Sequence, residues 1–230
     1  MRYFNNFADE RQLGVCVYCG NVNPETRDHV PSKVLLEQPY PEHLPVIPVC
    51  KECNSNLSID EEYVACFIES WRSEYYGKDF LRYKVRKIYE RKPTLRTRIE
   101  KSLRKGKNKT LMSGEMERFK NVFIKLAKGH LLFEFNEFKS EDPYSIDFFL
   151  LSEISKVEYD LFNSVPQVTN FPEVGSRAMQ RVVDMSDSDM RFMWQIVQEN
   201  RYRYLVAQLD FVIIKIVIDE FFGCQVILGD

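Results

Sequence analysis

The sequence predicts an α+β protein in which a small metal-stapled N-terminal module precedes several helices and a mixed α+β C-terminal body. Three observations support this fold class. Residues 14–57 are rich in turn formers, contain two Cys-x-x-Cys pairs and hold short apolar runs typical of brief strands. Much of the chain from residue 59 to residue 128 repeats apolar side chains with helical spacing. Beyond residue 130, aromatic and β-branched runs indicate strands.

The composition is that of a globular protein, because 44% of the 230 residues are hydrophobic and 29% are charged. The first residues lack the basic-then-apolar pattern of a signal peptide, and no run approaches the ~18 apolar residues of a membrane span. We therefore expect a soluble, cytoplasmic protein without a membrane partner. In that compartment the six cysteines are interpreted as thiols and metal ligands rather than as a disulfide framework.

The domain prediction follows these changes of pattern. The expected parts are a zinc-stapled module with its following helix (1–76), a basic helical segment (77–110) and an α+β C-terminal domain of unknown role (111–230).

Helices are predicted at three places before residue 130. The first covers residues 59–75, because Ser58 and Glu61 have capping-box spacing and apolar residues follow with helical period. The basic stretch that follows is expected as two helices broken at Pro93, since proline removes a backbone donor. The third helix, residues 115–128, is expected to end at Gly129.

Strands are predicted for "LLFEFNEF", "SIDFFLL" and the long run "RYLVAQLDFVIIKIVIDEFFGCQVIL", with a short helix around "DSDMRFMWQIVQEN". The long run is interpreted as one buried strand or a strand pair. Two roles remain open for it, namely packing of the core and contact with a second copy or a partner protein.

Charge is distributed unevenly along the chain, although the net charge is only −2. Residues 78–109 contain fourteen Lys and Arg against three acids. Such a segment is typical of a polyanion-binding face, and a solvated helix is the alternative. The candidate nucleic-acid contacts are Lys84, Arg86, Lys87, Arg96, Arg98, Lys101, Arg104 and Lys105.

The two cysteine pairs, Cys16-x-x-Cys19 and Cys50-x-x-Cys53, are thirty residues apart. Each pair can occupy one edge of a tetrahedron, and thiolates suit Zn²⁺. Because four protein ligands leave no open position, the predicted zinc is structural. The alternative is a set of unligated core cysteines.

The motif "TRDHVPSK" lies between the pairs, and "VCKECN" places Asn54 directly after the last cysteine. This order of motifs resembles the HNH nucleases of the ββα-metal endonuclease superfamily. Their pattern is a cysteine pair, then Asp-His followed by an aliphatic residue and a proline, then a second cysteine pair followed by His or Asn. The resemblance covers about residues 14–60. It implies a ββα-metal module with structural zinc and hydrolysis of phosphodiester bonds in nucleic acid, with DNA as the expected substrate.

The resemblance also implies residue roles. His29 would be the general base, since an imidazole with a pKa near ~6.5 can take a proton from water at neutral pH. Asp28 and Asn54 would hold a catalytic divalent cation, Mg²⁺ or Mn²⁺, which accepts carboxylate and amide oxygens. Neighbouring strand residues face opposite sides, so Asp28 and His29 can perform separate tasks. The alternatives are a loop histidine at position 29 and a turn or N-cap residue at position 54.

The sequence departs from the family pattern at two positions. The family's middle Asn is absent from "YPEHLPVIPVC", where His43 is nearest to its place and is therefore a candidate site residue. The family's Lys after the last motif is Leu57 here.

Three functions remain open at this point: a metal-dependent HNH endonuclease, a non-catalytic zinc-stapled nucleic-acid-binding protein, and a nuclease subunit of a defence system directed by a partner protein.

Overall fold

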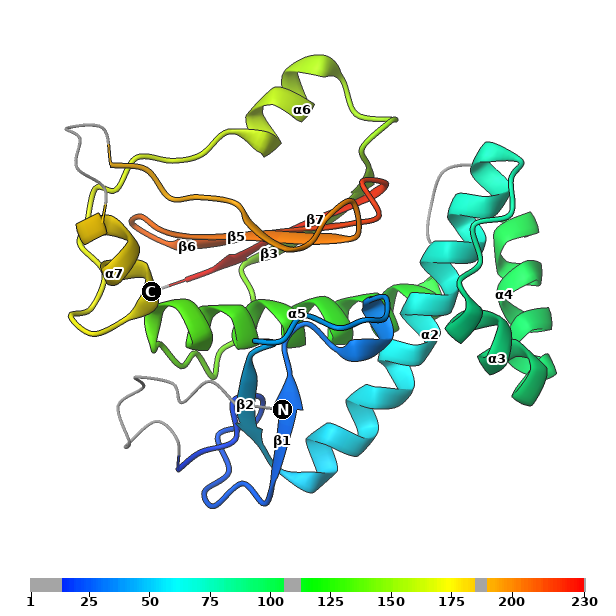
Figure 1. The fold of residues 1–230 in the computed structure, drawn as a ribbon, viewed down its shortest axis with the longest axis horizontal. Helices are drawn as coiled ribbons and strands as arrows, with labels where there is room; N and C mark the ends of the chain where they lie inside the picture. Colours follow the sequence, from blue (N-terminus) through cyan, green and yellow to red (C-terminus); the bar gives the residue numbers. More distant parts are fainter. Residues whose placement is uncertain (1–13, 106–112, 185–189, 230) are drawn as a thin grey trace. The chain divides into compact units, whose positions relative to one another are not determined.

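The computed structural model describes residues 14–105, 113–184 and 190–229. The helices and strands in chain order are β1 (Thr26–His29), the 3₁₀ turn η1 (Lys33–Leu35), β2 (Val46–Val49), α2 (Lys51–Tyr76), α3 (Tyr83–Arg91), α4 (Pro93–Lys105), α5 (Ser113–Phe135), β3 (Ser145–Leu150), α6 (Lys156–Asn163), α7 (Arg177–Asp184), β4 (Gln195–Gln198), β5 (Tyr202–Gln208), β6 (Val212–Ile218) and β7 (Phe222–Leu228) (Figure 1). The protein is thus α+β, as predicted.

Two compact units make up the chain. The first unit joins the residues up to Asn54 with those from Phe123 onward, and the second unit consists of Ser55–Val122. These boundaries differ from the predicted divisions after residues 76 and 110. The difference arises because the N-terminal cysteine-rich segment packs with a helix that lies about a hundred residues later in the chain.

In the first unit, β1 and β2 form an antiparallel hairpin that leads directly into α2. Asp28 pairs with Ile47 and His29 pairs with Val46. The helix begins at Lys51, eight residues before the predicted start at Ile59. The capping-box interpretation of Ser58 was therefore wrong: Ser58 lies inside the helix, where its hydroxyl donates to the carbonyl of Ser55 at 2.8 Å.

The C-terminal body is built on a five-stranded antiparallel sheet in the order β3-β7-β6-β5-β4. The long apolar run forms three strands, β5, β6 and β7, rather than one or two. All three are interior strands, so their hydrogen-bonding edges are used within the chain. Of the two roles predicted for the run, the structure shows it packed in the core of the sheet.

Helices cover both faces of this sheet. On one face lies α5 from Phe123 onward, and Phe123 contacts the rings of Phe148 and Phe222 (Figure 1). On the other face, Phe162 of α6 packs edge-on against Phe149, with ring centroids 4.8 Å apart. Neither α6 nor α7 was predicted, because each has only eight residues.

Helix α5 continues past Gly129 to Phe135, and residues 136–138 form no strand, so the predicted helix end at Gly129 and the predicted strand "LLFEFNEF" were wrong. The glycine has a different purpose. A Cβ at position 129 would lie 2.7 Å from a methyl group of Val30 and 3.1 Å from one of Ile47. The missing side chain lets the β1–β2 hairpin approach the helix backbone closely.

The predicted helix around "DSDMRFMWQIVQEN" was also wrong in its described part. Residues 195–198 form the edge strand β4, which pairs with β5. Residues 185–189 lie outside the described residues. The spacing of apolar residues did not predict the structure here, because residues 195–198 pair with β5 at the edge of the sheet, and tertiary pairing decides strand formation.

The second unit contains α3 and α4, which are separated at Pro93 as predicted. Val85, Ile88 and Ile99 are buried, so the apolar side of these helices faces the unit's core. A buried ion pair between Arg82 and Glu69 joins the segment before α3 to α2. No described helix combines the length and apolar character that a membrane crossing requires.

His130 is completely buried between α5 and the sheet. Its ring stacks on Tyr204 with centroids 3.6 Å apart, and its Nε2 lies 2.8 Å from the hydroxyl of Tyr202. Burial lowers the pKa of His130 to about 3, because the charged imidazolium loses its hydration. The histidine is therefore part of the core, neutral at physiological pH.

This burial predicts acid sensitivity. The unfolded chain protonates His130 below about pH 6.5, whereas the folded protein keeps it neutral down to about pH 3, so the unfolded state binds more protons between these values. From this residue alone, the free energy of unfolding should fall by about 2 kcal/mol between pH 8 and pH 5. Urea denaturation of wild type and of His130→Gln measures it. Equal pH slopes for the two proteins would contradict the prediction.

Candidate functional site

The first cysteine pair lies in a tight turn that is fastened to the hairpin. The amide of Gly20 donates to the carbonyl of Cys16 at 2.8 Å, and Gly20 has φ +73°, a conformation that favours glycine. The amide of Val17 donates to the carbonyl of Pro48 at 3.2 Å, which attaches the turn to β2. Glycine directly after the Cys-x-x-Cys pair is thus a requirement of the turn.

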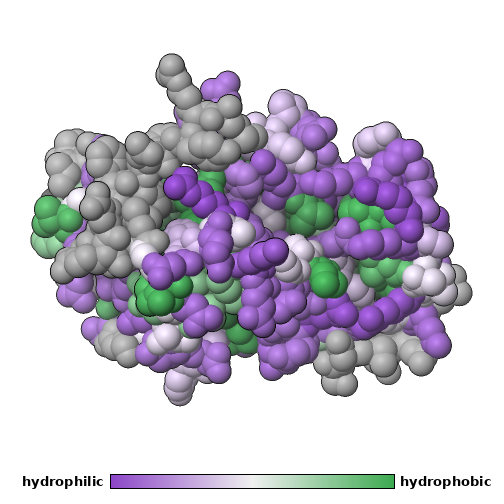
Figure 2. Space-filling model, turned by 90° about the horizontal axis from the view of Figure 1, so that it is seen from below, coloured by the Kyte–Doolittle hydropathy of each residue, from purple (hydrophilic) through white to green (hydrophobic). Residues whose placement is uncertain are grey.

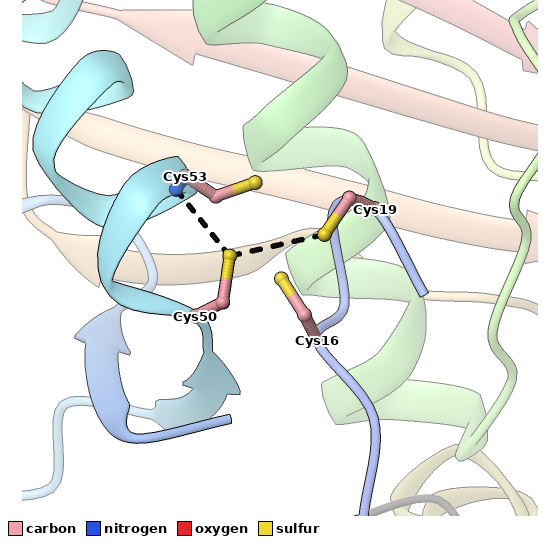
Figure 3. Close-up of side chains that lie close together, drawn as sticks. All are labelled: Cys16, Cys19, Cys50 and Cys53. Carbon is pink, nitrogen blue, oxygen red and sulfur yellow. Dashed lines mark hydrogen bonds between the residues drawn. The ribbon is translucent and has the colours of Figure 1, made fainter. Parts of the chain in front are cut away.

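The structure brings all four predicted zinc ligands together (Figure 3). The sulfurs of Cys16, Cys19, Cys50 and Cys53 lie within 4.8 Å of one another and point towards a common centre. Cys50 directly precedes α2 and Cys53 lies in its first turn, so the helix start supplies one pair and the N-terminal turn supplies the other.

This geometry fits a tetrahedral zinc ion. Four Zn–S bonds of ~2.3 Å place the sulfurs about 3.8 Å apart, and the Sγ atoms of Cys19 and Cys50 are 3.8 Å apart. Burial raises the pKa of the Cys53 thiol, and the neighbouring thiols add to this effect. Metal binding would therefore displace protons that the free thiols hold. Among the described residues, the structure brings together one such group of His, Cys, Asp or Glu ligands.

Asp28 and His29 are adjacent on β1 and face opposite sides of it. Asp28 contacts Lys125 of α5, and Val30 meets the same helix at Gly129. Residues two apart in a strand share a side, so Asp28 faces α5 and His29 faces away from it. The predicted separation of the two side chains is therefore present.

His29 is half-buried, and its Nδ1 is buried without a hydrogen-bond partner among the described residues. Burial lowers the pKa of His29, and the positive charge of Lys33 lowers it further. The negative charge of Asp28 and the nearby backbone of Pro45 raise this pKa and act in the opposite direction. The net effect favours the neutral imidazole, the form that can accept a proton.

Asp28 is held by three donors. Its Oδ1 accepts from the backbone amide of His29 at 2.8 Å. Its Oδ2 accepts from the hydroxyl of Tyr18 at 3.0 Å and lies 2.6 Å from Nζ of Lys125. Sequence reasoning missed Tyr18 and Lys125. The available signal was a lysine on the flank of an apolar helix face, three residues after Val122 and one before Leu126.

Asn54 lies in the first turn of α2, next to β1. Its amide nitrogen donates to Oγ1 of Thr26 at 3.1 Å and is 3.4 Å from the carbonyl oxygen of Arg27. Because the nitrogen is used in these contacts, the side chain's oxygen is the atom left for a ligand. Thr26 shares a side of β1 with Asp28, so Asn54 lies on the Asp28 side of the strand.

The donor set of Asp28 and Asn54 suits a hard divalent cation, because it offers a carboxylate and an amide oxygen. The Asp28 carboxylate has little free capacity to bind a cation. A carboxylate has about four lone-pair sites, and the three donors described above use most of them.

The candidate His43 is exposed in the loop before β2. Pro45, two residues after His43, holds the segment that carries His29. The carbonyl of Pro45 accepts from the amide of Val30 at 3.0 Å. Backbone groups thus anchor the segment in which the family's middle Asn is absent.

The predicted basic residues lie on α3 and α4 in the second unit, and several are paired with acids. Arg86 pairs with Asp79, Lys87 with Glu90, Arg96 with Glu100, and Arg98 with Glu115, at 2.5–3.3 Å. These arginines and Lys87 have 43–57% exposed side chains. Lys101 is exposed and Lys84 is half-buried, whereas the side chains of Arg104 and Lys105 lie outside the described set.

The pairs of Arg86, Lys87 and Arg96 are exposed on both sides. Such pairs contribute about 0–1 kcal/mol each, so phosphates can replace their acidic partners at small cost. The molecular face in Figure 2 is largely hydrophilic, with its hydrophobic residues in separate small patches.

Comparison of the chain with protein-family models, with curated proteins and with solved structures finds no match.

The cysteine cluster gives a direct prediction. Purified protein should contain about one zinc per chain, and Cys50→Ser should lose the zinc and lower the melting temperature, because binding energy at such a site is folding energy. The matched control is Cys224→Ala, which removes a buried thiol from β7 outside the cluster. Elemental analysis and thermal denaturation measure both effects. A zinc-free wild type, or equal zinc content in both variants, would contradict the assignment.

Proposed function

We propose that the protein is a metal-dependent endonuclease of the HNH class that hydrolyses phosphodiester bonds, most naturally in DNA. One observation carries the proposal: a β-hairpin and the helix that follows it are joined to a four-cysteine cluster, with Asp28 and His29 on β1 and Asn54 in the first turn of the helix, bonded to Thr26 of β1. These are the residues that the family pattern assigns to catalysis. Their spacing in the sequence and their packing in the fold support the same site.

His29 is proposed as the general base. Its lowered pKa leaves the imidazole neutral near pH 7, and it faces the side of β1 away from the Asp28 carboxylate. In this role the ring takes a proton from a water molecule that attacks the phosphorus atom.

Asp28 and Asn54 are proposed to hold the divalent cation. When bound, Mg²⁺ or Mn²⁺ would supply positive charge to the phosphate and to the leaving oxygen. The zinc-stapled turn would position Tyr18, whose hydroxyl orients Asp28. The cysteines would have a structural role only, because four thiolates leave no ligand position for substrate.

The basic helices α3 and α4 are proposed to bind the phosphate backbone. Contacts of this type supply affinity and salt dependence without reading the base sequence. The fourteen Lys and Arg of residues 78–109 outnumber the three acids of the same segment, so the segment carries a net positive charge.

Cleavage by the zinc-loaded protein tests the activity. Supercoiled plasmid, single-stranded DNA and RNA are incubated with Mg²⁺ or Mn²⁺. We expect His29→Ala to lower the cleavage rate at least ~100-fold, the usual contribution of a general base. The control is Glu42→Ala, an exposed loop change. If wild type is as inert as His29→Ala on every substrate, the enzymatic proposal is wrong and a nucleic-acid-binding protein is the remaining interpretation.

Salt dependence of binding tests the basic helices separately. Replacing Arg96 and Lys101 with Gln should weaken DNA binding and reduce the slope of log K against log salt by about 1 for each lost phosphate contact. The matched control replaces Lys156 and Arg191, two exposed basic residues outside α3 and α4. Fluorescence anisotropy at several salt concentrations measures the slope, and the same loss in both pairs of variants would refute a dedicated binding face.

A further inference from the structure

Lys125 is a buried lysine directly behind the candidate site. Its side chain is 1% exposed, and its Nζ lies 2.6 Å from Oδ2 of Asp28. The same nitrogen is 3.4 Å from the hydroxyl of Ser32 and 5.6 Å from the centre of the Tyr18 ring. An ammonium is costly to bury without partners, so this lysine and Asp28 require each other in the folded protein.

The pair links two distant parts of the sequence. Asp28 belongs to the strand that carries His29, whereas Lys125 comes from α5, 97 residues later. The helix is fixed against the strand nearby, because Gly129 of α5 contacts Val30. The ammonium is therefore held by a helix that packs closely against the hairpin in the first unit.

Asp28 is also the carboxylate that would hold a divalent cation. A metal ion at Asp28 must share the carboxylate with Lys125, and two cations on one carboxylate repel each other strongly at separations of about 4 Å. The ammonium of Lys125 neutralises the Asp28 carboxylate, as a bound metal ion would. Lys125 and the metal would therefore interact with the same carboxylate.

We propose that Lys125 is a positioning residue of the site: its ammonium holds Asp28 in place without a metal and competes with a divalent cation for the same carboxylate. The inference rests on the proposed function only in that it takes Asp28 as a ligand of that cation. Its consequence is weak metal affinity in the wild-type protein.

Calorimetric titration with Mn²⁺ tests the competition without measuring activity. The zinc-loaded full chain is compared with Lys125→Gln, which removes the charge but keeps a donor for Asp28. We expect Lys125→Gln to bind Mn²⁺ at least ~10-fold more tightly, because the repulsion between cations is removed. The added affinity should disappear in Lys125→Gln combined with Asp28→Asn. Equal or weaker Mn²⁺ binding by Lys125→Gln would overturn the proposal.

A matched control lies one turn further along the same helix. Lys128 is also buried, and its Nζ donates to the carbonyl of Ser140 at 3.0 Å rather than to Asp28. Lys128→Gln should leave Mn²⁺ affinity unchanged. A similar gain in Lys128→Gln would show a general effect of lost charge and would overturn the specific role of Lys125.

A measurement on the wild type covers the case in which Lys125→Gln does not fold. In protein labelled with ¹⁵N-lysine, the Lys125 ammonium signal is identified by its contact with the Tyr18 ring. Saturating Mg²⁺ should shift or remove this signal. A signal that stays unchanged would overturn the proposal.

The outcomes are distinguishable from failure of the proposed function. Tighter, Asp28-dependent Mn²⁺ binding by Lys125→Gln, with no cleavage by any form, supports the competition and rejects the nuclease. Cleavage that depends on His29, with equal Mn²⁺ affinity in wild type and Lys125→Gln, supports the nuclease and rejects the competition.

Discussion

The close packing of α5 against the β1–β2 hairpin is the contact on which the candidate site depends. Gly129 removes the side chain that would otherwise keep Val30 and Ile47 away from the helix. This approach brings Lys125 to Asp28 and adds Leu132 to the hydrophobic cluster around Cys16 and Cys50. The cysteine-rich segment is too small to bury a core of its own, so it uses the helix of the C-terminal body as one wall.

Polar groups buried around α5 extend this dependence to the sheet. Glu134 accepts from Tyr204 of β5 and from Arg181 of α7, and His130 stacks on the same tyrosine. On the opposite face, Nζ of Lys215 donates to the carbonyls of Leu161 and Ser164 at the end of α6. Burial lowers the pKa of Lys215 to about 8. These buried polar groups thus join neighbouring elements, because an unpaired group would be costly there.

Local sequence rules worked where the signal was local. The break at Pro93 and the strand "SIDFFLL" were found, because proline chemistry and β-branched or aromatic content act within a few residues. The rules failed where a tertiary partner decided the outcome. Gly129 resembles a helix stop in isolation, yet the hairpin against it explains the glycine, and α5 continues. Ser58 has capping-box spacing, yet α2 starts at Lys51, directly after β2.

By itself, the sequence determined the four-cysteine cluster and the adjacency of Asp28 and His29, whereas the structure placed Asn54 in the first turn of a helix that starts at Lys51. The cluster and the adjacency follow from spacing, since short motifs fix their own geometry through ligand bite and strand alternation. Only the tertiary structure decided that Lys125 neutralises Asp28 and that the Pro45 backbone anchors the segment bearing His29. Contacts between residues 97 positions apart depend on how helices and strands pack, and no local pattern encodes which lysine a buried carboxylate will meet.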